Sequence, residues 1–128
     1  IQEMSTLSQH RLPVKGFILN NQYMGMVRQW QEFFHGGRYA ESYTHSLPDF
    51  QRLAEAFGAV GLQATKPDEV DDVIKEMLAT DNAVIADIRV DPEENVYPMI
   101  PAGAAHYEMT LGPDEQVGEQ SEEGMVLV

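Results

Sequence analysis

The sequence predicts an α/β fold in which a parallel sheet is flanked by helices. Three short apolar runs, at residues 14–19, 60–64 and 83–90, have the length of buried strands. The segments between them carry apolar residues at helical spacing, bounded by Pro, Asp and Gly. The resulting order of strand, helix, helix, strand, helix and strand predicts a parallel sheet with right-handed crossovers.

The chain opens on a helical pattern that leads into the first strand. Ile1, Met4 and Leu7 keep a helical period, but no Ser, Thr, Asp or Asn cap and no initiating Met precede them. This opening is typical of a fragment of a longer protein. Pro13 marks the entry to the strand at 14–19, whose apolar residues predict burial on both faces.

Two asparagines, Asn20 and Asn21, end the first strand and lead directly into an amphipathic helix. Its apolar side chains recur at helical spacing until Gly36 and Gly37; they are Met26, Val27, Trp30, Phe33 and Phe34. Such junctions bind phosphates and metals in α/β proteins. Taken alone, an asparagine pair is more often a strand-ending turn than a metal site, and Met26 and Trp30 are typical of a helix core.

The next helix and strand follow the loop at residues 38–47. Pro48 and Asp49 predict the start of the helix, and Gly58 predicts its end. The inward face of this helix contains Phe50, Leu53, Ala54 and Phe57. A short strand at 60–64 comes next.

The last helix, strand and loop complete the pattern. Thr65 is the expected N-cap of a helix at 67–78, whose apolar face contains Val70, Val73, Ile74, Met77 and Leu78. Asp87 interrupts the apolar run of the strand at 83–90. A partly exposed edge and a hydrogen-bonded carboxylate both explain it better than a general base. Residues 91–105 contain three prolines, which predicts an ordered loop.

Residues 19–30 resemble the second half of the thiamine-diphosphate motif in the large, catalytic subunit of acetolactate synthase. The likeness rests on the asparagine pair followed by Gly25, Met26, Val27, Gln29 and Trp30, and it continues through Pro48-Asp49-Phe50, residues 53–56, the strand near Val84 and the Pro98-Met99-Ile100-Pro101 turn. Ala102 departs from the family, which often has serine there. The resemblance implies that residues 1–109 form the C-terminal part of a flavodoxin-like, diphosphate-binding domain. Residues 110–128 then form an acidic, disordered tail.

The resemblance also implies a cofactor and metal site at the junction. In the family, the second asparagine and the backbone carbonyl two residues later bind Mg²⁺; here these are Asn21 and Tyr23. Gly25 and Met26 match positions that approach the cofactor and contact its pyrimidine ring, and Trp30 matches a residue of the substrate channel. The carboxylate half of the motif, Gly-Asp-Gly or Gly-Asp-Ala, is expected roughly 27 residues before Asn21, ahead of this chain.

The function that the resemblance implies is the decarboxylative condensation of two pyruvates, or of pyruvate and 2-oxobutyrate, in branched-chain amino-acid synthesis. Its cofactors are thiamine diphosphate and Mg²⁺, with FAD on a domain absent from this chain. The expected partners are further full-length subunits, in a homodimer or tetramer, and a regulatory small subunit. The family's activating glutamate comes from a neighbouring subunit, so no catalytic side chain is assigned here. The isolated fragment is expected to be inactive.

Composition excludes several other classes. The net charge of −13, from 8 basic and 21 acidic residues, argues against nucleic-acid binding. The absence of cysteine excludes a disulfide framework and a zinc–thiolate site. No apolar run reaches membrane-spanning length and no signal peptide is visible, so we expect a cytoplasmic protein.

Two alternatives stay open at this level. Another thiamine-diphosphate-dependent decarboxylase or carboligase would share the sheet and the asparagine. A stand-alone flavodoxin-like binding or interaction module would share the fold and never contact the cofactor.

Overall fold

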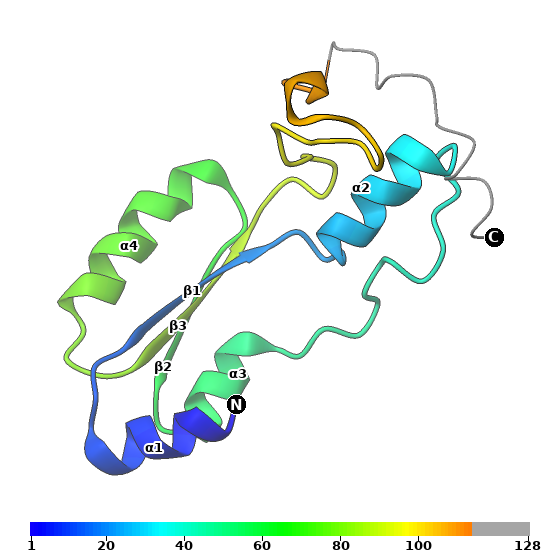
Figure 1. The fold of residues 1–128 in the computed structure, drawn as a ribbon. Helices are drawn as coiled ribbons and strands as arrows, with labels where there is room; N and C mark the ends of the chain where they lie inside the picture. The colour runs from blue at the N-terminus through cyan, green and yellow to red at the C-terminus, as the bar shows by residue number, and fades with distance from the viewer. Residues whose placement is uncertain (114–128) are drawn as a thin grey trace. The chain divides into compact units, whose positions relative to one another are not determined.

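The computed structural model describes residues 1–113, which form two compact units (Figure 1). We call the first the sheet unit; it comprises Ile1–Gln22 and His45–Pro92. The second, the α2 unit, comprises Tyr23–Thr44 and the described residues from Glu93 onward. Most of the acidic tail expected at 110–128 lies outside the described residues.

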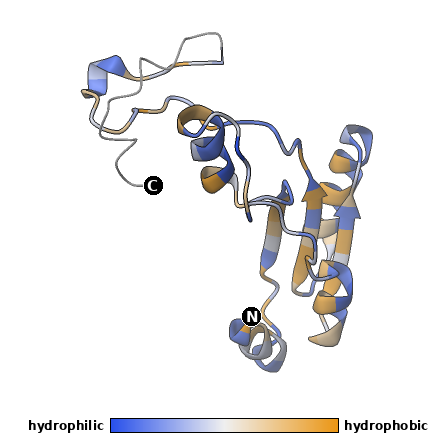
Figure 2. Cartoon of the chain, turned by 90° about the vertical axis from the view of Figure 1, so that its right-hand side faces the viewer, coloured by the Kyte–Doolittle hydropathy of each residue, from blue (hydrophilic) through white to orange (hydrophobic). Residues whose placement is uncertain are grey.

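The sheet unit contains three parallel strands, β1 (Lys15–Asn20), β2 (Val60–Ala64) and β3 (Val84–Arg89). Their order is β1-β3-β2, so β3 is central. Orange, apolar segments run along the strands in Figure 2. The predicted parallel sheet is confirmed, and each strand boundary lies within one residue of the predicted one.

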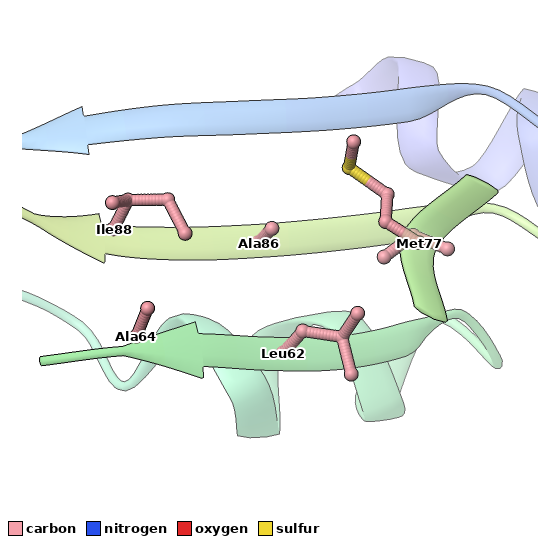
Figure 3. Close-up of a cluster of buried hydrophobic side chains, with 6 residues drawn as sticks. Leu62, Ala64, Met77, Ala86 and Ile88 are labelled. Atoms are coloured by element: carbon pink, nitrogen blue, oxygen red, sulfur yellow. The ribbon is translucent and has the colours of Figure 1, made fainter. Parts of the chain in front are cut away.

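One face of this sheet packs against α4 (Val70–Ala79). Met77 of α4 lies over the side chains of β2 and β3 (Figure 3). The buried residues of this cluster are Leu62, Ala64, Met77, Val84, Ala86 and Ile88. Burying a side chain as large as Leu62 or Met77 contributes about 1.5–3 kcal/mol, so this cluster is a main source of stability for the sheet unit.

The opposite face packs against α3 (Phe50–Ala56), with α1 (Gln2–His10) beside it. Ala54 of α3 is fully buried with Ala59 and Ala83, and Ile85 packs against this second cluster together with Met4 and Leu7 of α1. Because side chains alternate along a strand, Ile85 and Ala86 serve opposite faces. The sheet is therefore a layer between helices, as predicted.

The prediction that the first strand is buried on both faces is wrong for this chain. Phe17 is 40% exposed and Leu19 is 67% exposed. They pair in register with Ala86 and Ile88, so they point to the face that α4 covers. Since α4 packs over β2 and β3, the apolar side chains of the edge strand β1 stay in solvent.

The start of α3 follows the prediction. The side chain of Asp49 accepts a hydrogen bond from the Arg52 N–H at 3.0 Å, which satisfies a donor of the first turn. Gly58 then adopts φ +71° just after the helix, a left-handed conformation that glycine tolerates best.

The N-cap predicted at Thr65 is wrong. A 3₁₀ turn, η1 (Pro67–Glu69), precedes α4, and its N-cap is Lys66. The carboxylate of Glu69 reaches back and accepts the N–H groups of Thr65 and Lys66 at 2.8 and 3.1 Å. Thr65 donates its hydroxyl to the same carboxylate at 3.2 Å, so it serves Glu69 instead of capping the helix itself.

The α2 unit contains one long helix, α2 (Gly25–Phe34), and the loop that follows β3. The loop predicted at 91–105 is confirmed, and a 3₁₀ turn, η2 (His106–Glu108), follows it. An isolated antiparallel bridge pairs Met99, within the loop, with Thr110. None of the helices within residues 1–113 has the length and apolar character needed to cross a membrane.

Helix α2 buries polar residues instead of the expected apolar ones. Arg28 and Gln29 are 7% and 2% exposed, whereas Met26 and Trp30 are 49% and 40% exposed. The interpretation of Met26 and Trp30 as core residues is therefore wrong for this unit. Gln29 is buried because its amide pairs with the main chain of the loop at Val96.

Candidate functional site

The carboxyl end of β1 is fixed by both ends of one buried amide. Asn20 is 6% exposed, and its Nδ2 donates to Oδ1 of Asp87 on β3 at 2.8 Å. Its Oδ1 accepts the main-chain N–H of Gln22 at 3.1 Å. Asparagine commonly closes a turn in this way, through a bond to the backbone two residues on. Asn20 thus ties the turn after β1 to the central strand.

Asp87 is the centre of this polar cluster and is 2% exposed. Besides the bond from Asn20, Asp87 accepts a hydrogen bond from Nε2 of Gln63 on β2 at 3.1 Å. It also forms an ion pair with Nε of Arg89 at 3.3 Å. A buried carboxylate needs such partners, because an unpaired buried charge is very costly. Of the two explanations left open by the sequence, the hydrogen-bonded carboxylate is confirmed, and the partly exposed edge is wrong.

Asn21 lies inside the turn that this cluster holds, half-buried at the carboxyl edge of the sheet. Gln22, which follows it, adopts φ +62°, the left-handed conformation that few side chains favour. Ligands of open parallel sheets bind beyond the carboxyl ends of the strands, which is where Asn21 stands. A fixed turn at this edge is suited to holding a ligand.

The donor chemistry at Asn21 fits Mg²⁺. This ion prefers oxygen ligands, and the amide oxygen of asparagine supplies one without adding negative charge beside a phosphate. Within residues 1–113, no group of three or more His, Cys, Asp or Glu side chains could hold a metal. One amide oxygen fills one of the six positions around Mg²⁺, so an ion held by Asn21 would take further oxygen ligands, such as those of a diphosphate.

The other predicted site residues belong to the α2 unit. The segment before α2 pairs with residues 42–43: Tyr23 forms an isolated antiparallel bridge with Tyr43, and the Met24 N–H donates to Ser42 O at 2.8 Å. The rings of Tyr23 and Tyr43 lie 5.0 Å apart. Gly25 is the first residue of α2. The assignment of cofactor contacts to Tyr23, Gly25 and Met26 stays a prediction.

An open hollow in the α2 unit brings two of the predicted residues together. Met26 and Trp30 lie one helical turn apart and share its lining. The complete lining is Met26, Val27, Trp30, Gln31, His35 and Arg38. The exposed apolar face of α2 is therefore one side of a hollow, which suits the predicted role of Trp30 in a channel.

Arg28 was not singled out by the sequence, yet it organises the polar side of α2. Its Cζ lies 5.5 Å from the centre of the Tyr23 ring and 5.1 Å from that of Tyr39. Its Nη1 forms an ion pair with Glu32 at 2.7 Å. In the sequence, only the spacing of four residues between Arg28 and Glu32 indicated this ion pair. The same spacing is equally common on solvent-exposed helices.

The fold agrees with a comparison to known families. Residues 1–88 match the family model described as thiamine pyrophosphate enzyme, C-terminal TPP binding domain. The chain belongs to this family.

Its relatives among the thiamine pyrophosphate enzymes include acetolactate synthases. The chain is 43% identical to the acetolactate synthase large subunit of Haemophilus influenzae over 117 residues, which cover 91% of this chain and 20% of the relative. It is 46% identical to the acetolactate synthase isozyme 3 large subunit of Escherichia coli over 119 residues, covering 91% of this chain and 21% of the relative. The chain thus spans about a fifth of the length of these proteins.

A solved structure of a thiamine diphosphate-dependent enzyme has a similar fold. The thiamine diphosphate-dependent 4-hydroxybenzoylformate decarboxylase of Rhodococcus jostii RHA1 matches with a TM-score of 0.63 and 25% identity. The match covers 72% of this chain and 17% of the decarboxylase. It supports the expected α/β architecture of a thiamine-diphosphate-binding domain.

Proposed function

We propose that this chain is part of the diphosphate-binding domain of an acetolactate synthase large subunit. In this proposal residues 1–109 are the C-terminal part of that domain, and residues 110–128 are an acidic tail. The identity of 43% and 46% to two such subunits, over nine-tenths of the chain, supports this assignment over other enzymes of the family.

The structural observation that carries the proposal is the fixed turn at Asn21. The amide oxygen of Asn21 and the backbone carbonyl of Tyr23 bind Mg²⁺, which holds the diphosphate of the cofactor. Gly25 and Met26 contact the cofactor, and Trp30 lines the substrate channel. Thiamine diphosphate supplies the chemistry of decarboxylation and carbon–carbon bond formation, while the residues of this chain bind and orient.

The whole protein condenses two pyruvates, or pyruvate and 2-oxobutyrate, with loss of CO₂, in branched-chain amino-acid synthesis. It acts in the cytoplasm as a homodimer or tetramer, with a regulatory small subunit and with FAD on a domain outside this chain. This chain contributes no catalytic acid or base, so alone it forms no acetolactate.

The proposal is tested in the intact protein that carries this chain. Asn21→Ala is expected to weaken Mg²⁺-dependent binding of thiamine diphosphate by about tenfold or more, measured by titration calorimetry, and to reduce acetolactate formation from pyruvate. Asn82→Ala is the matched control. It removes the same type of side chain, but at the amino-terminal edge of the sheet, just before β3. A wild-type protein that binds no thiamine diphosphate with Mg²⁺ would instead be a stand-alone binding module.

A thiamine-diphosphate-dependent decarboxylase is the second candidate. The similarity to the 4-hydroxybenzoylformate decarboxylase favours it, although the identity of 25% is well below that to the synthases. Product analysis separates the two: acetolactate from pyruvate supports the synthase, and an aldehyde with CO₂ supports the decarboxylase.

A further inference from the structure

We propose that Asp87 is a positioning residue for the Mg²⁺–thiamine diphosphate site, acting through Asn20 on Asn21. This inference rests on the proposed function. Asp87 accepts hydrogen bonds from Asn20 and Gln63 and forms an ion pair with Arg89. The amide of Asn20 connects Asp87 to the turn that contains Asn21, because it also accepts the Gln22 N–H.

The location of Asp87 calls for such a role. It occupies the central strand at 2% exposure, on the same face as the apolar Ile85. An apolar residue there would avoid the cost of burying a carboxylate, because replacing buried ion pairs by apolar side chains is often neutral or stabilising. A buried carboxylate at this position is more easily explained by what it orients than by the stability it adds.

Asp87 fixes the orientation of the Asn20 side-chain amide. A carboxylate accepts hydrogen bonds and cannot donate them, so Nδ2 of Asn20 must face Asp87. The amide oxygen then has to face the opposite way, where it accepts the Gln22 N–H at 3.1 Å. Without Asp87 the amide could rotate, and the oxygen would no longer be held against the turn.

This turn sets the direction of the Asn21 side chain. Residues 20–22 form a short segment in which Gln22 has φ +62°, so the Asn20–Gln22 hydrogen bond stabilises an otherwise unfavourable conformation. The side chain of Asn21 leaves the backbone inside this segment. Partners that orient a metal ligand typically change metal affinity 10- to 100-fold when removed.

The test uses the intact protein that carries this chain and measures Mg²⁺-dependent binding of thiamine diphosphate by titration calorimetry. Asp87→Ala and Asn20→Ala are each expected to weaken binding about 10- to 100-fold. The double variant is expected to lose little more affinity for thiamine diphosphate than either single variant, because each substitution removes the same Asp87–Asn20 hydrogen bond. Asp87→Asn is expected to bind more tightly than Asp87→Ala, since its amide oxygen can still accept from Asn20.

A matched variant separates positioning from simple destabilisation. Met77→Ala removes a buried side chain of the α4 cluster, remote from Asn20 in the sequence and on the opposite face of the sheet. It should lower the melting temperature without the cofactor and leave the affinity for thiamine diphosphate unchanged. If Asp87→Ala does not fold, Asn20→Ala and Asp87→Asn answer the same question.

The outcomes distinguish this inference from the proposed function. If the wild type binds thiamine diphosphate with Mg²⁺ and Asn21→Ala loses binding, the proposed site is supported. Wild-type affinity in Asn20→Ala and Asp87→Ala would then overturn the positioning role alone. If Asn21→Ala also binds like the wild type, the proposed site itself fails.

Discussion

The side-chain amide of Gln29 pairs with both main-chain groups of Val96. Its Nε2 donates to Val96 O at 3.0 Å, and its Oε1 accepts the Val96 N–H at 2.7 Å. Gln29 is 2% exposed, and its Nε2 also lies 2.9 Å from the sulfur of Met99. One buried side chain of α2 therefore holds the loop that follows β3.

Replacing Gln29 by Leu is expected to destabilise the α2 unit. The Val96 N–H and C=O lose their partner, and a typical intramolecular hydrogen bond contributes about 0.5–1.5 kcal/mol. Denaturant unfolding should show the loss, and hydrogen exchange at the Val96 amide should accelerate. Gln31→Leu is the control on the same helix, because its amide makes one exposed bond to Ala40 O. Equal effects of the two variants would contradict a special role for Gln29.

Gln29 also shows where sequence reasoning ends. Its position in the helical period gives no sign that it is buried, and its partner lies 67 residues along the chain. The same separation divides Asn20 from Asp87. Polar pairs of this kind are created by the tertiary fold, so neither local spacing nor propensity reveals them.

Local signals, in contrast, were sufficient for the sheet. Apolar runs located the strands, and the cap at Asp49 located the start of α3. The prediction that Phe17 and Leu19 are buried was wrong. Their burial depends on which element covers them, and the apolar run alone does not carry that information. The candidate metal ligand Asn21 came from the resemblance, while the support that Asp87 gives to the neighbouring Asn20 came from the structure.

Gly61 is expected to tolerate no side chain. A Cβ built there would lie 2.5 Å from the Cα and 2.7 Å from the carbonyl oxygen of Gln51, which are rigid backbone atoms of α3. Gly61→Ala should therefore destabilise the sheet unit by about 1–3 kcal/mol, as overpacking does. Thermal and denaturant unfolding measure the loss.

Gly16, on the edge strand β1, provides the control for Gly61. The nearest atom to a Cβ at Gly16 is Val84 O at 3.5 Å, an ordinary contact. Gly16→Ala should be neutral or stabilise by up to about 1 kcal/mol, because alanine restricts the unfolded chain. A cost at Gly16 equal to that at Gly61 would show that close approach to α3 is not the cause.

Glu69 is expected to make the start of α4 sensitive to acid. The hydrogen bond from the Thr65 N–H, with further bonds from Lys66 N–H and the Thr65 hydroxyl, lowers the pKa of Glu69 below its ordinary value of 4.5. Because the folded pKa is the lower one, this stabilisation is complete above pH 4.5 and is lost as the pH falls through the folded pKa.

The substitution Glu69→Gln removes the charge while keeping the side chain's size. It should lower stability at neutral pH and flatten the dependence of the unfolding midpoint on pH below 4.5. Thr65→Val, which keeps the main-chain N–H and removes only the 3.2 Å hydroxyl bond, should have a smaller effect. An acid profile of Glu69→Gln that matches the wild type would rule out this role of the carboxylate.

The uncovered side chains of β1 are expected to make the isolated 128-residue chain self-associate. Phe17 and Leu19 are 40% and 67% exposed on the same face of an edge strand, and an exposed apolar edge favours pairing with a second copy. In the wild-type chain the average mass measured by light scattering should increase with concentration. Leu19→Lys should make this increase smaller. Leu78→Lys changes a leucine of α4, outside β1, that is 69% exposed, and should leave the association as it is. A strictly monomeric wild-type chain would mean that the exposed face of β1 does not bind a second copy.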